Sequence, residues 1–226
     1  IGLLSIEYTC IDGGDCYTES LCLFNTGVNT SKLYRMELFV NKFATNCKKM
    51  SGDELHTLLD QIHEIHGFYS PPFLGLAAAV ACCAFTFLLG GGPTEMFCAF
   101  LGAGAGNYLR AKMNQHHLTL FLCTAASVAL ACVVYTISFM ALKSGFDVSI
   151  HHQAGYICSM LFIIPGFPFI TSGIDLAKLD MRSGMERLTY AIIIIAVATL
   201  TAWMLALVLH LKPMDFLPLG LNKFQY

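Results

Sequence analysis

The residues best suited to chemistry lie between positions 163 and 188, where an apolar run is interrupted and polar side chains follow the interruption. A proline removes a backbone N–H and clashes with the preceding helical turn. In lipid, each carbonyl freed in this way costs several kcal/mol unless the protein pairs with it. Such a break is expected to line a polar cavity in which hydroxyls and a carboxylate contact a substrate, as discontinuous helices do in transporters. The candidate substrate-binding residues are Pro165, Gly166, Pro168, Thr171, Ser172 and Asp175.

Asp175 is the strongest single candidate, because a carboxylate inside a membrane is costly and by default functional. It lies about one turn beyond the two hydroxyl residues, where it is able to bind an ammonium group or to couple transport to a proton. The alternative is an interfacial carboxylate that pairs with Lys178 or Arg182. The charged run from Lys178 to Arg187 is interpreted mainly as a solvated cluster at a helix end, because exposed ion pairs are energetically weak.

A glycine-rich run supplies the other candidates. Gly102 and Gly106 are four residues apart and present a small face that lets another helix approach closely; a glycine run without a specific contact is the alternative. Asn107 either hydrogen-bonds substrate or holds two helices together. Glu95 follows Pro93, and its carboxylate is expected to complement the N-terminus of a helix.

Metal and enzyme sites are not predicted. Asp60, His63 and His66 have helical spacing, but no recognised metal-ligand pattern is completed, and surface or loop histidines are the preferred interpretation. The sequence contains no nucleophile elbow, phosphate loop or metalloprotease signature, so neither an enzyme nor a cofactor is expected. The four cysteines before residue 70 form no C-x-x-C pair, and a disulfide between two of them stays open.

Composition predicts a membrane protein. Of the 226 residues, 56% are hydrophobic and 12% charged, and the mean hydropathy is +0.63, whereas soluble domains are about 25% charged. The net charge of −2 offers no basic surface for nucleic acid. The apolar excess begins after Pro72, which predicts a head at residues 1–70, a membrane domain at 71–212 and the start of a linker at 213–226. Without an initiator Met or a signal peptide, the chain is expected to be a fragment that is incomplete at its N-terminus.

The head is expected to be a small α/β domain. Alternating strands at residues 3–10 and 17–23 flank a turn rich in Asp and Gly and predict a hairpin. Helical periodicity follows at residues 33–43 and 55–65, with Asn29 or Thr30 capping the first helix and Ser51 the second.

The remaining chain is predicted to form an α-helical membrane domain of five transmembrane helices, each near the roughly 20 residues that a span needs. The loops that carry Arg110 and Lys112, and later Lys178 to Arg187, are the more basic set, so they and the head are assigned to the cytoplasm. The protein is therefore expected to be multi-pass in the inner (plasma) membrane. The predicted spans are Phe73–Leu89, Pro93–Leu109, Leu118–Leu142, Ala154–Ile174 and Leu188–Leu211, the fourth broken at the PGFP motif.

The run PGFPFITSGIDL resembles the proline-glycine-x-proline, polar, Asp pattern of the threonine/serine exporter family. Gly27-Val28-Asn29, Tyr69-Ser70-Pro71 and Phe87-Leu88-Leu89-Gly90-Gly91 are also similar to that family, so the resemblance covers nearly the whole chain. Carried over residue by residue, the pattern falls on Pro165, Gly166, Pro168 and Asp175. Where the family motif has a hydrophobic residue followed by Asn, this chain has Thr171-Ser172. The resemblance therefore does not fix the substrate.

The resemblance implies a secondary exporter of small hydrophilic metabolites that is driven by proton motive force. Threonine and serine are the preferred substrates. Some relatives are associated with succinate as a two-subunit system, which makes a dicarboxylate exporter subunit the first alternative. A membrane scaffold that transports nothing and recruits a partner is the second. The resemblance also implies a second membrane half, fused or separate, and an oligomer. Substrate, coupling ion and stoichiometry stay open at this point.

Overall fold

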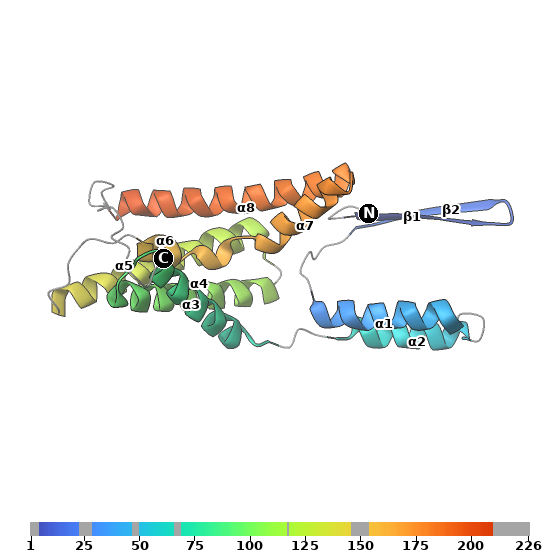
Figure 1. Ribbon diagram of the computed structural model, residues 1–226, viewed down its shortest axis with the longest axis horizontal. Helices are drawn as coiled ribbons and strands as arrows, with labels where there is room; N and C mark the ends of the chain where they lie inside the picture. Colours follow the sequence, from blue (N-terminus) through green and yellow to red (C-terminus); the bar gives the residue numbers. More distant parts are fainter. Residues whose placement is uncertain are drawn as a thin grey trace. The chain divides into compact units, whose positions relative to one another are not determined.

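The computed structural model describes residues 5–22, 29–46, 50–65, 69–116, 118–145 and 154–209, and these are largely helical (Figure 1). The chain divides into two compact units, Ile1–Tyr69 and Ser70–Tyr226. The first contains β1 (Ser5–Asp12), β2 (Asp15–Cys22), α1 (Thr30–Asn46) and α2 (Gly52–His63). The second contains α3 (Pro71–Leu88), α4 (Pro93–Gln115), α5 (Leu120–Gly145), α6 (Ala154–Cys158), the 3-10 turn η2 (Leu161–Ile163), α7 (Gly166–Ala177) and α8 (Met181–Val208).

The predicted hairpin is confirmed as an antiparallel pair of β1 and β2. Its two-residue turn consists of Gly13 and Gly14, whose φ angles are +56° and +110°. Positive φ at both turn positions matches the twist of the strands and favours glycine. Across the pair the Tyr8 hydroxyl donates to the Glu19 carboxylate, and this bond raises the pKa of Tyr8 to about 12.

The two head helices form where periodicity predicts them, and local caps define their starts. Asn29, rather than Thr30, caps α1, because its Oδ1 accepts the N–H groups of Ser31 at 3.1 Å and Lys32 at 3.2 Å. The Ser51 hydroxyl accepts the N–H of Glu54 at 3.3 Å and caps α2. Neither helix contains a fully buried side chain among its described residues, so the helix pair has only a thin apolar contact.

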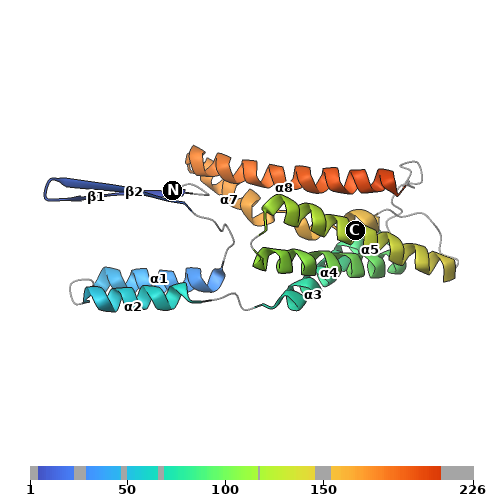
Figure 2. The same cartoon turned by 180° about the vertical axis from the view of Figure 1, so that it is seen from behind.

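The membrane unit is a bundle in which α4 packs between α3 and α5, and α8 packs against α5 and α7 (Figure 2). Its buried residues are mostly small. Close approach of backbones through small residues is how helices associate in a membrane, where lipid removes the hydrophobic driving force. One buried cluster joins α5, η2 and α8 and consists of Val128, Cys132, Ile163, Ile194, Ala198 and Ala202.

The five predicted spans are not confirmed. Among the described residues, three helices are long and apolar enough to cross a membrane: α3, α5 and α8. The segments Ala154–Ile163 and Gly166–Ala177, bent by 63° against each other, make a fourth if they count as one broken span. The helix α4 has 23 residues but is not apolar enough, because it combines one proline and three glycines with Glu95, Asn107 and a basic C-terminal turn.

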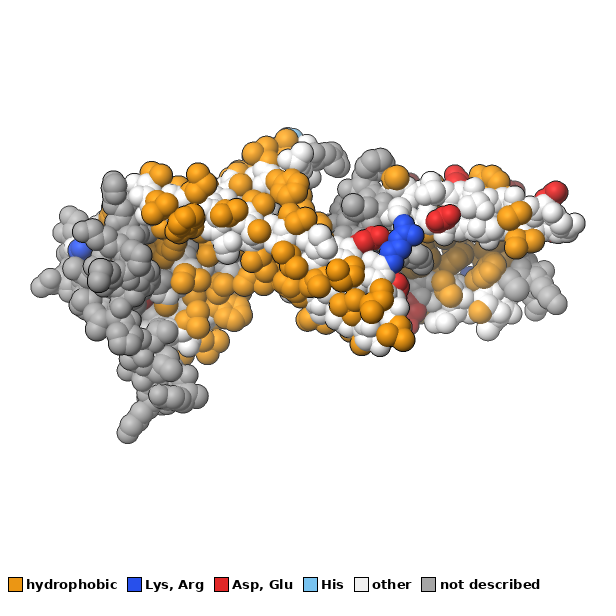
Figure 3. All heavy atoms as spheres, turned by 90° about the horizontal axis from the view of Figure 1, so that it is seen from above, with side chains coloured by type: hydrophobic (Ala, Val, Ile, Leu, Met, Phe, Trp, Pro, Cys, Tyr) orange, Lys and Arg blue, Asp and Glu red, His pale blue; other side chains and the backbone are white. Residues whose placement is uncertain are grey.

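The last span begins earlier than predicted. Helix α8 starts at Met181 rather than Leu188, because the Asp180 carboxylate accepts the N–H of Ser183 at 3.3 Å and caps the helix. The connection from α7 is a short turn in which Leu179 has a φ of +64°. Figure 3 shows hydrophobic side chains along the outer surface of α8 and charged side chains at one end of it, as expected of a helix that faces lipid.

Candidate functional site

The candidate site is the interruption of helical structure between η2 and α7, which is called the break below. Pro165 has no N–H to donate, and the N–H of Gly166 turns back to the carbonyl of Ile164 at 2.9 Å. Helical bonding resumes where the N–H of Phe169 donates to the carbonyl of Pro165 at 3.2 Å. The two prolines and the glycine therefore redirect the backbone locally, which produces the 63° bend.

Arg110 of α4 contacts this break. Its Nη1 lies 3.5 Å from the carbonyl oxygen of Phe162, in η2. In an uninterrupted helix that carbonyl would accept the N–H of Gly166, which bonds to Ile164 instead. By its place in the sequence, Arg110 is predicted only to be a loop charge that sets the orientation of the protein. The missed signal was a cation inside a long helix rather than in a loop, since α4 extends to Gln115.

The two hydroxyl residues of the motif lie on the first turns of α7 and bond to its own backbone. The Thr171 hydroxyl donates to the carbonyls of Phe167 at 2.9 Å and Pro168 at 3.2 Å. The Ser172 hydroxyl, buried in the structure, donates to the carbonyl of Phe169 at 2.8 Å. Each hydroxyl oxygen still has a lone pair with which to accept a bond from a ligand.

Asp175 pairs with a cation on the neighbouring helix. Its Oδ2 lies 3.3 Å from Nε of Arg187, and the two side chains are 22% and 29% exposed. The partner is therefore Arg187 of α8, rather than the Lys178 or Arg182 that the interfacial interpretation named. Arg182 instead forms an exposed pair with Glu186, at 3.4 Å. A half-buried pair between two helices is screened less by solvent than such a surface pair.

Gly102 and Gly106 of α4 lie against α5. A Cβ on Gly102 would be 2.7 Å from the carbonyl oxygen of Ala131, and one on Gly106 would be 2.8 Å from both Ala131 Cβ and Ser127 O. Real Cβ atoms essentially never come so close, so the two helices approach to a distance that only glycine permits.

Asn107 points toward α3 rather than toward the break. Its Nδ2 donates to the carbonyl of Leu74 at 2.8 Å, a bond between α4 and α3. Glu95, with 4% of its surface exposed, accepts the N–H of Gly92 at 2.9 Å, at the N-terminus of α4. The Tyr156 hydroxyl donates to the carbonyl of Ala202 at 2.8 Å and so joins α6 to α8.

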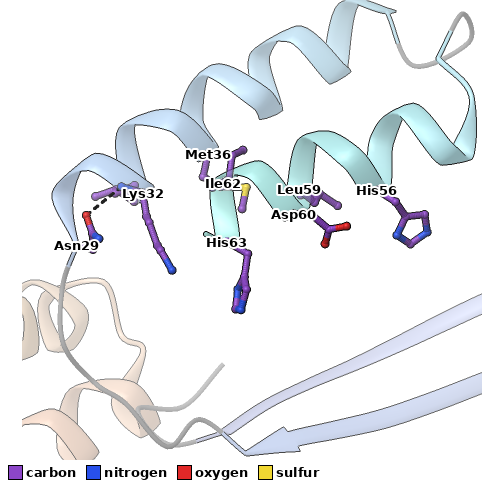
Figure 4. Close-up of a pocket in the computed structure, with 9 residues that line it drawn as sticks. Asn29, Lys32, Met36, His56, Leu59, Asp60, Ile62 and His63 are labelled. Carbon is purple, nitrogen blue, oxygen red and sulfur yellow. Dashed lines mark hydrogen bonds between the residues drawn. The ribbon is translucent and has the colours of Figure 1, made fainter. Parts of the chain in front are cut away.

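A second candidate region is a cavity of 720 Å³ between α1 and α2 of the head (Figure 4). Lys32 of α1 and Asp60 and His63 of α2 line it together with apolar side chains. Within the described ranges, no three His, Cys, Asp or Glu side chains are placed to hold a metal ion, and His66 lies outside them. Cys10, Cys16 and Cys22 are free thiols, while Cys47 lies outside the described residues.

Comparison with known proteins places the chain in a family. Residues 1–210 match the family model described as "Putative threonine/serine exporter". The chain belongs to the threonine/serine exporter family. It is similar to the "Probable succinate transporter subunit YjjP" of Escherichia coli (strain K12), with 25% identity over 207 residues that make up 88% of this chain and 77% of that protein.

A second relative of the same name, from Klebsiella aerogenes, is 24% identical over 208 residues, which cover 88% of this chain and 76% of that protein. No solved structure matches the chain significantly. Membership in an exporter family, together with the apolar helices α3, α5 and α8, makes this exporter-family chain a multi-pass membrane protein. The relatives are named as subunits, which points to a transporter assembled from more than one part.

Proposed function

We propose that this exporter-family protein is a secondary active exporter of threonine and serine in the inner (plasma) membrane, driven by proton motive force. The observation that carries the proposal is the broken segment between η2 and α7, bent by 63° and accompanied by charged side chains from neighbouring helices. A break of this kind exposes backbone dipoles to a ligand, and substrates of secondary transporters bind at such breaks.

The ion pair between Asp175 and Arg187 is the proposed coupling element. An amino-acid zwitterion carries one cation and one anion, so its ammonium group competes with Arg187 for the carboxylate. Protonation of Asp175 removes the charge that attracts both cations. Occupancy by substrate and occupancy by a proton therefore exclude each other at this carboxylate, which is the requirement for exchange of one against the other.

The other motif residues have supporting roles in the proposal. Pro165, Gly166 and Pro168 create the break, and the lone pairs of the Thr171 and Ser172 oxygens face the ligand. Asn107 is the weakest candidate for direct binding, because its amide already donates to α3. A second membrane half, fused or supplied as a separate subunit, would complete the pathway, in keeping with inverted repeats that enclose a midplane site.

A dicarboxylate such as succinate is the second candidate substrate. Both relatives bear names that refer to succinate transport. The charge next to the break also favours an anion, because the guanidinium of Arg110 reaches the Phe162 carbonyl there, whereas Arg187 is paired with Asp175 near the other end of α7. A non-transporting scaffold is the remaining alternative and predicts no efflux of either substrate.

Efflux from loaded cells tests the function. Cells that express the chain, alone or together with a candidate second membrane half, are loaded with radiolabelled L-threonine, L-serine or succinate, and release is compared with that of cells lacking the gene. We expect faster release of threonine and serine, abolished by a protonophore. Release of succinate alone would select the dicarboxylate alternative, and unchanged release of all three would leave the scaffold.

The proposed orientation is tested separately. With the head in the cytoplasm, a cysteine introduced at Lys143 into a cysteine-free background should react with an impermeant maleimide added outside intact cells. A cysteine at Lys112 should stay protected until the membrane is opened. The reverse pattern would contradict a cytoplasmic head.

A further inference from the structure

We propose that Arg110 binds a carboxylate group of the transported molecule at the helix break. This inference rests on the proposed export function for the identity of the ligand, and it assigns a specific contact that the sequence motif does not contain. It is carried by the position of the guanidinium and by the number of its donors that the protein leaves unused.

Arg110 lies where several elements of the membrane unit converge. It belongs to α4, and its guanidinium reaches the carbonyl of Phe162 in η2. Tyr190 of α8 and Cys123 of α5 are near enough to interact with it electrostatically. A cation held among α4, α5, η2 and α8 is partly removed from solvent, and a charge in such a place is costly unless something compensates it.

The protein compensates this charge poorly. A guanidinium presents five N–H donors in a planar fork, and in the described part of the chain the Arg110 side chain makes a single hydrogen bond, of 3.5 Å, to a neutral carbonyl. The two ion pairs among the described residues involve Arg182 and Arg187, not Arg110. The remaining donors are therefore free to bind a planar anion.

The surroundings favour a carboxylate. Arg110 is the charged side chain that contacts the break, because Asp175 pairs with Arg187 in the last turn of α7, nine residues along the helix from Gly166. The break also starts α7, and the first turn of a helix has a positive potential. Next to it, a Cβ added to Gly166 would meet no atom within 4 Å, which leaves open space on that side of the backbone.

A guanidinium and a carboxylate match in geometry as well as in charge, because two parallel N–H groups meet two oxygens. L-Threonine, L-serine and succinate all carry this group, so the same contact would serve either proposed substrate class. The competing explanation is that Arg110 only satisfies the carbonyl of Phe162, whose helical partner, the N–H of Gly166, bonds to Ile164 instead. The two explanations differ in whether ligand affinity depends on Arg110.

The test measures ligand binding to the full chain purified in detergent, by isothermal titration with L-threonine, succinate and 1-amino-2-propanol, which is threonine without its carboxylate. Three variants are compared with the unchanged protein: Arg110→Gln, Arg110→Lys and, as the matched control, Arg182→Gln, whose side chain is 72% exposed. Thermal unfolding of each variant reports any structural loss independently of binding.

We expect Arg110→Gln to weaken binding of the carboxylate ligand at least about tenfold. Arg110→Lys should keep part of the affinity, because the charge remains while the fork is lost. Arg182→Gln should bind normally, and 1-amino-2-propanol should bind weakly to the unchanged protein and to Arg110→Gln alike. Whether threonine or succinate shows the effect identifies the source of the carboxylate.

Equal affinities of the unchanged protein and Arg110→Gln for the carboxylate ligands would overturn the proposal, whatever happens to thermal stability. Arg110 would then serve only as a hydrogen-bond donor to the Phe162 carbonyl. A chain that binds none of the carboxylates would overturn it as well. Because these measurements use purified protein, cellular efflux still decides the export function on its own. If Arg110→Gln is too unstable to purify, Arg110→Lys takes its place. Unchanged affinity of Arg110→Lys for both L-threonine and succinate would then contradict binding of a carboxylate by the paired N–H groups of the guanidinium.

Discussion

The glycine-rich helix α4 and the proline-broken segment that ends in α7 use the same small residue for opposite purposes. On α4, Gly102 and Gly106 leave no room for a Cβ against α5. On α7, Gly166 and Gly173 have nothing within 4 Å of an added Cβ. Helix α4 is thus in close contact with α5, whereas α7 has open space beside its two glycines.

This difference separates a scaffold from a site within one membrane unit. Glycines in α4 bring helices together, so their replacement should cost stability. The segment from the break through α7 instead meets charges from other helices, Arg110 at the break and Arg187 at Asp175, so changes there should affect transport more than folding.

The largest effect is expected at Gly106. Leucine there would drive its side chain into Ala131 and Ser127 of α5, and even alanine should cost about 1–3 kcal/mol through overpacking. Gly106→Leu should therefore nearly abolish the folded fraction recovered by size-exclusion chromatography in detergent. Ala105→Leu, on the adjacent face, and Gly173→Ala, in open space, should be recovered normally. Equal recovery of all three would mean that the α4–α5 contact is not a scaffold.

Along α7 we expect function to fail before folding does. Asp175→Asn keeps the size of the side chain but removes its charge, and we expect export to fall at least about tenfold, which corresponds to roughly 1.4 kcal/mol. Lys178→Gln, in the exposed turn, should lose less. Initial rates of threonine efflux, normalised to protein in the membrane, measure both.

A charge swap sharpens the same prediction. If Asp175 and Arg187 serve only to hold α7 against α8, the double variant Asp175→Arg with Arg187→Asp should restore export, because the pair at 3.3 Å is preserved. We expect no restoration, since the carboxylate would then sit on α8, away from the motif. Full recovery of efflux would reduce the pair to a structural contact.

A moderate effect on stability is expected at Asn107. Its amide bonds Leu74 O at 2.8 Å between α4 and α3, and the loss of such a bond typically costs about 1 kcal/mol. Asn107→Ala should lower the stability measured by unfolding in detergent by that amount, as should Tyr156→Phe, which removes the bond from α6 to α8. Normal stability with lost export would instead identify Asn107 as a substrate contact.

The smallest effect is expected at Arg182. Its pair with Glu186 is exposed, with the Arg182 side chain 72% accessible, and exposed pairs contribute at most about 1 kcal/mol. Arg182→Gln should therefore leave both unfolding and efflux nearly unchanged. A large loss of efflux would move the functional charges from the break to this end of α8.

Local signals in the sequence were sufficient for several elements. The Gly13-Gly14 turn, the Asn29 and Ser51 caps and the proline break all depend on residues within a few positions of one another, and each forms where the pattern predicted. The membrane character and the family also follow from the sequence alone, since they depend on composition and on a motif that is continuous in the chain.

Only the tertiary structure decided which charges meet. Arg187 lies 12 positions after Asp175, and Arg110 lies 52 positions before Phe162, so nothing in local spacing distinguishes them from Lys178 or Lys112. The five-span count stays unconfirmed for a related reason: α4 packs against both α3 and α5, and its small and polar residues keep it below the hydropathy of a span. Partners of a charge in a membrane protein are set by helix packing, which brings distant residues together through contacts that no short window of sequence contains.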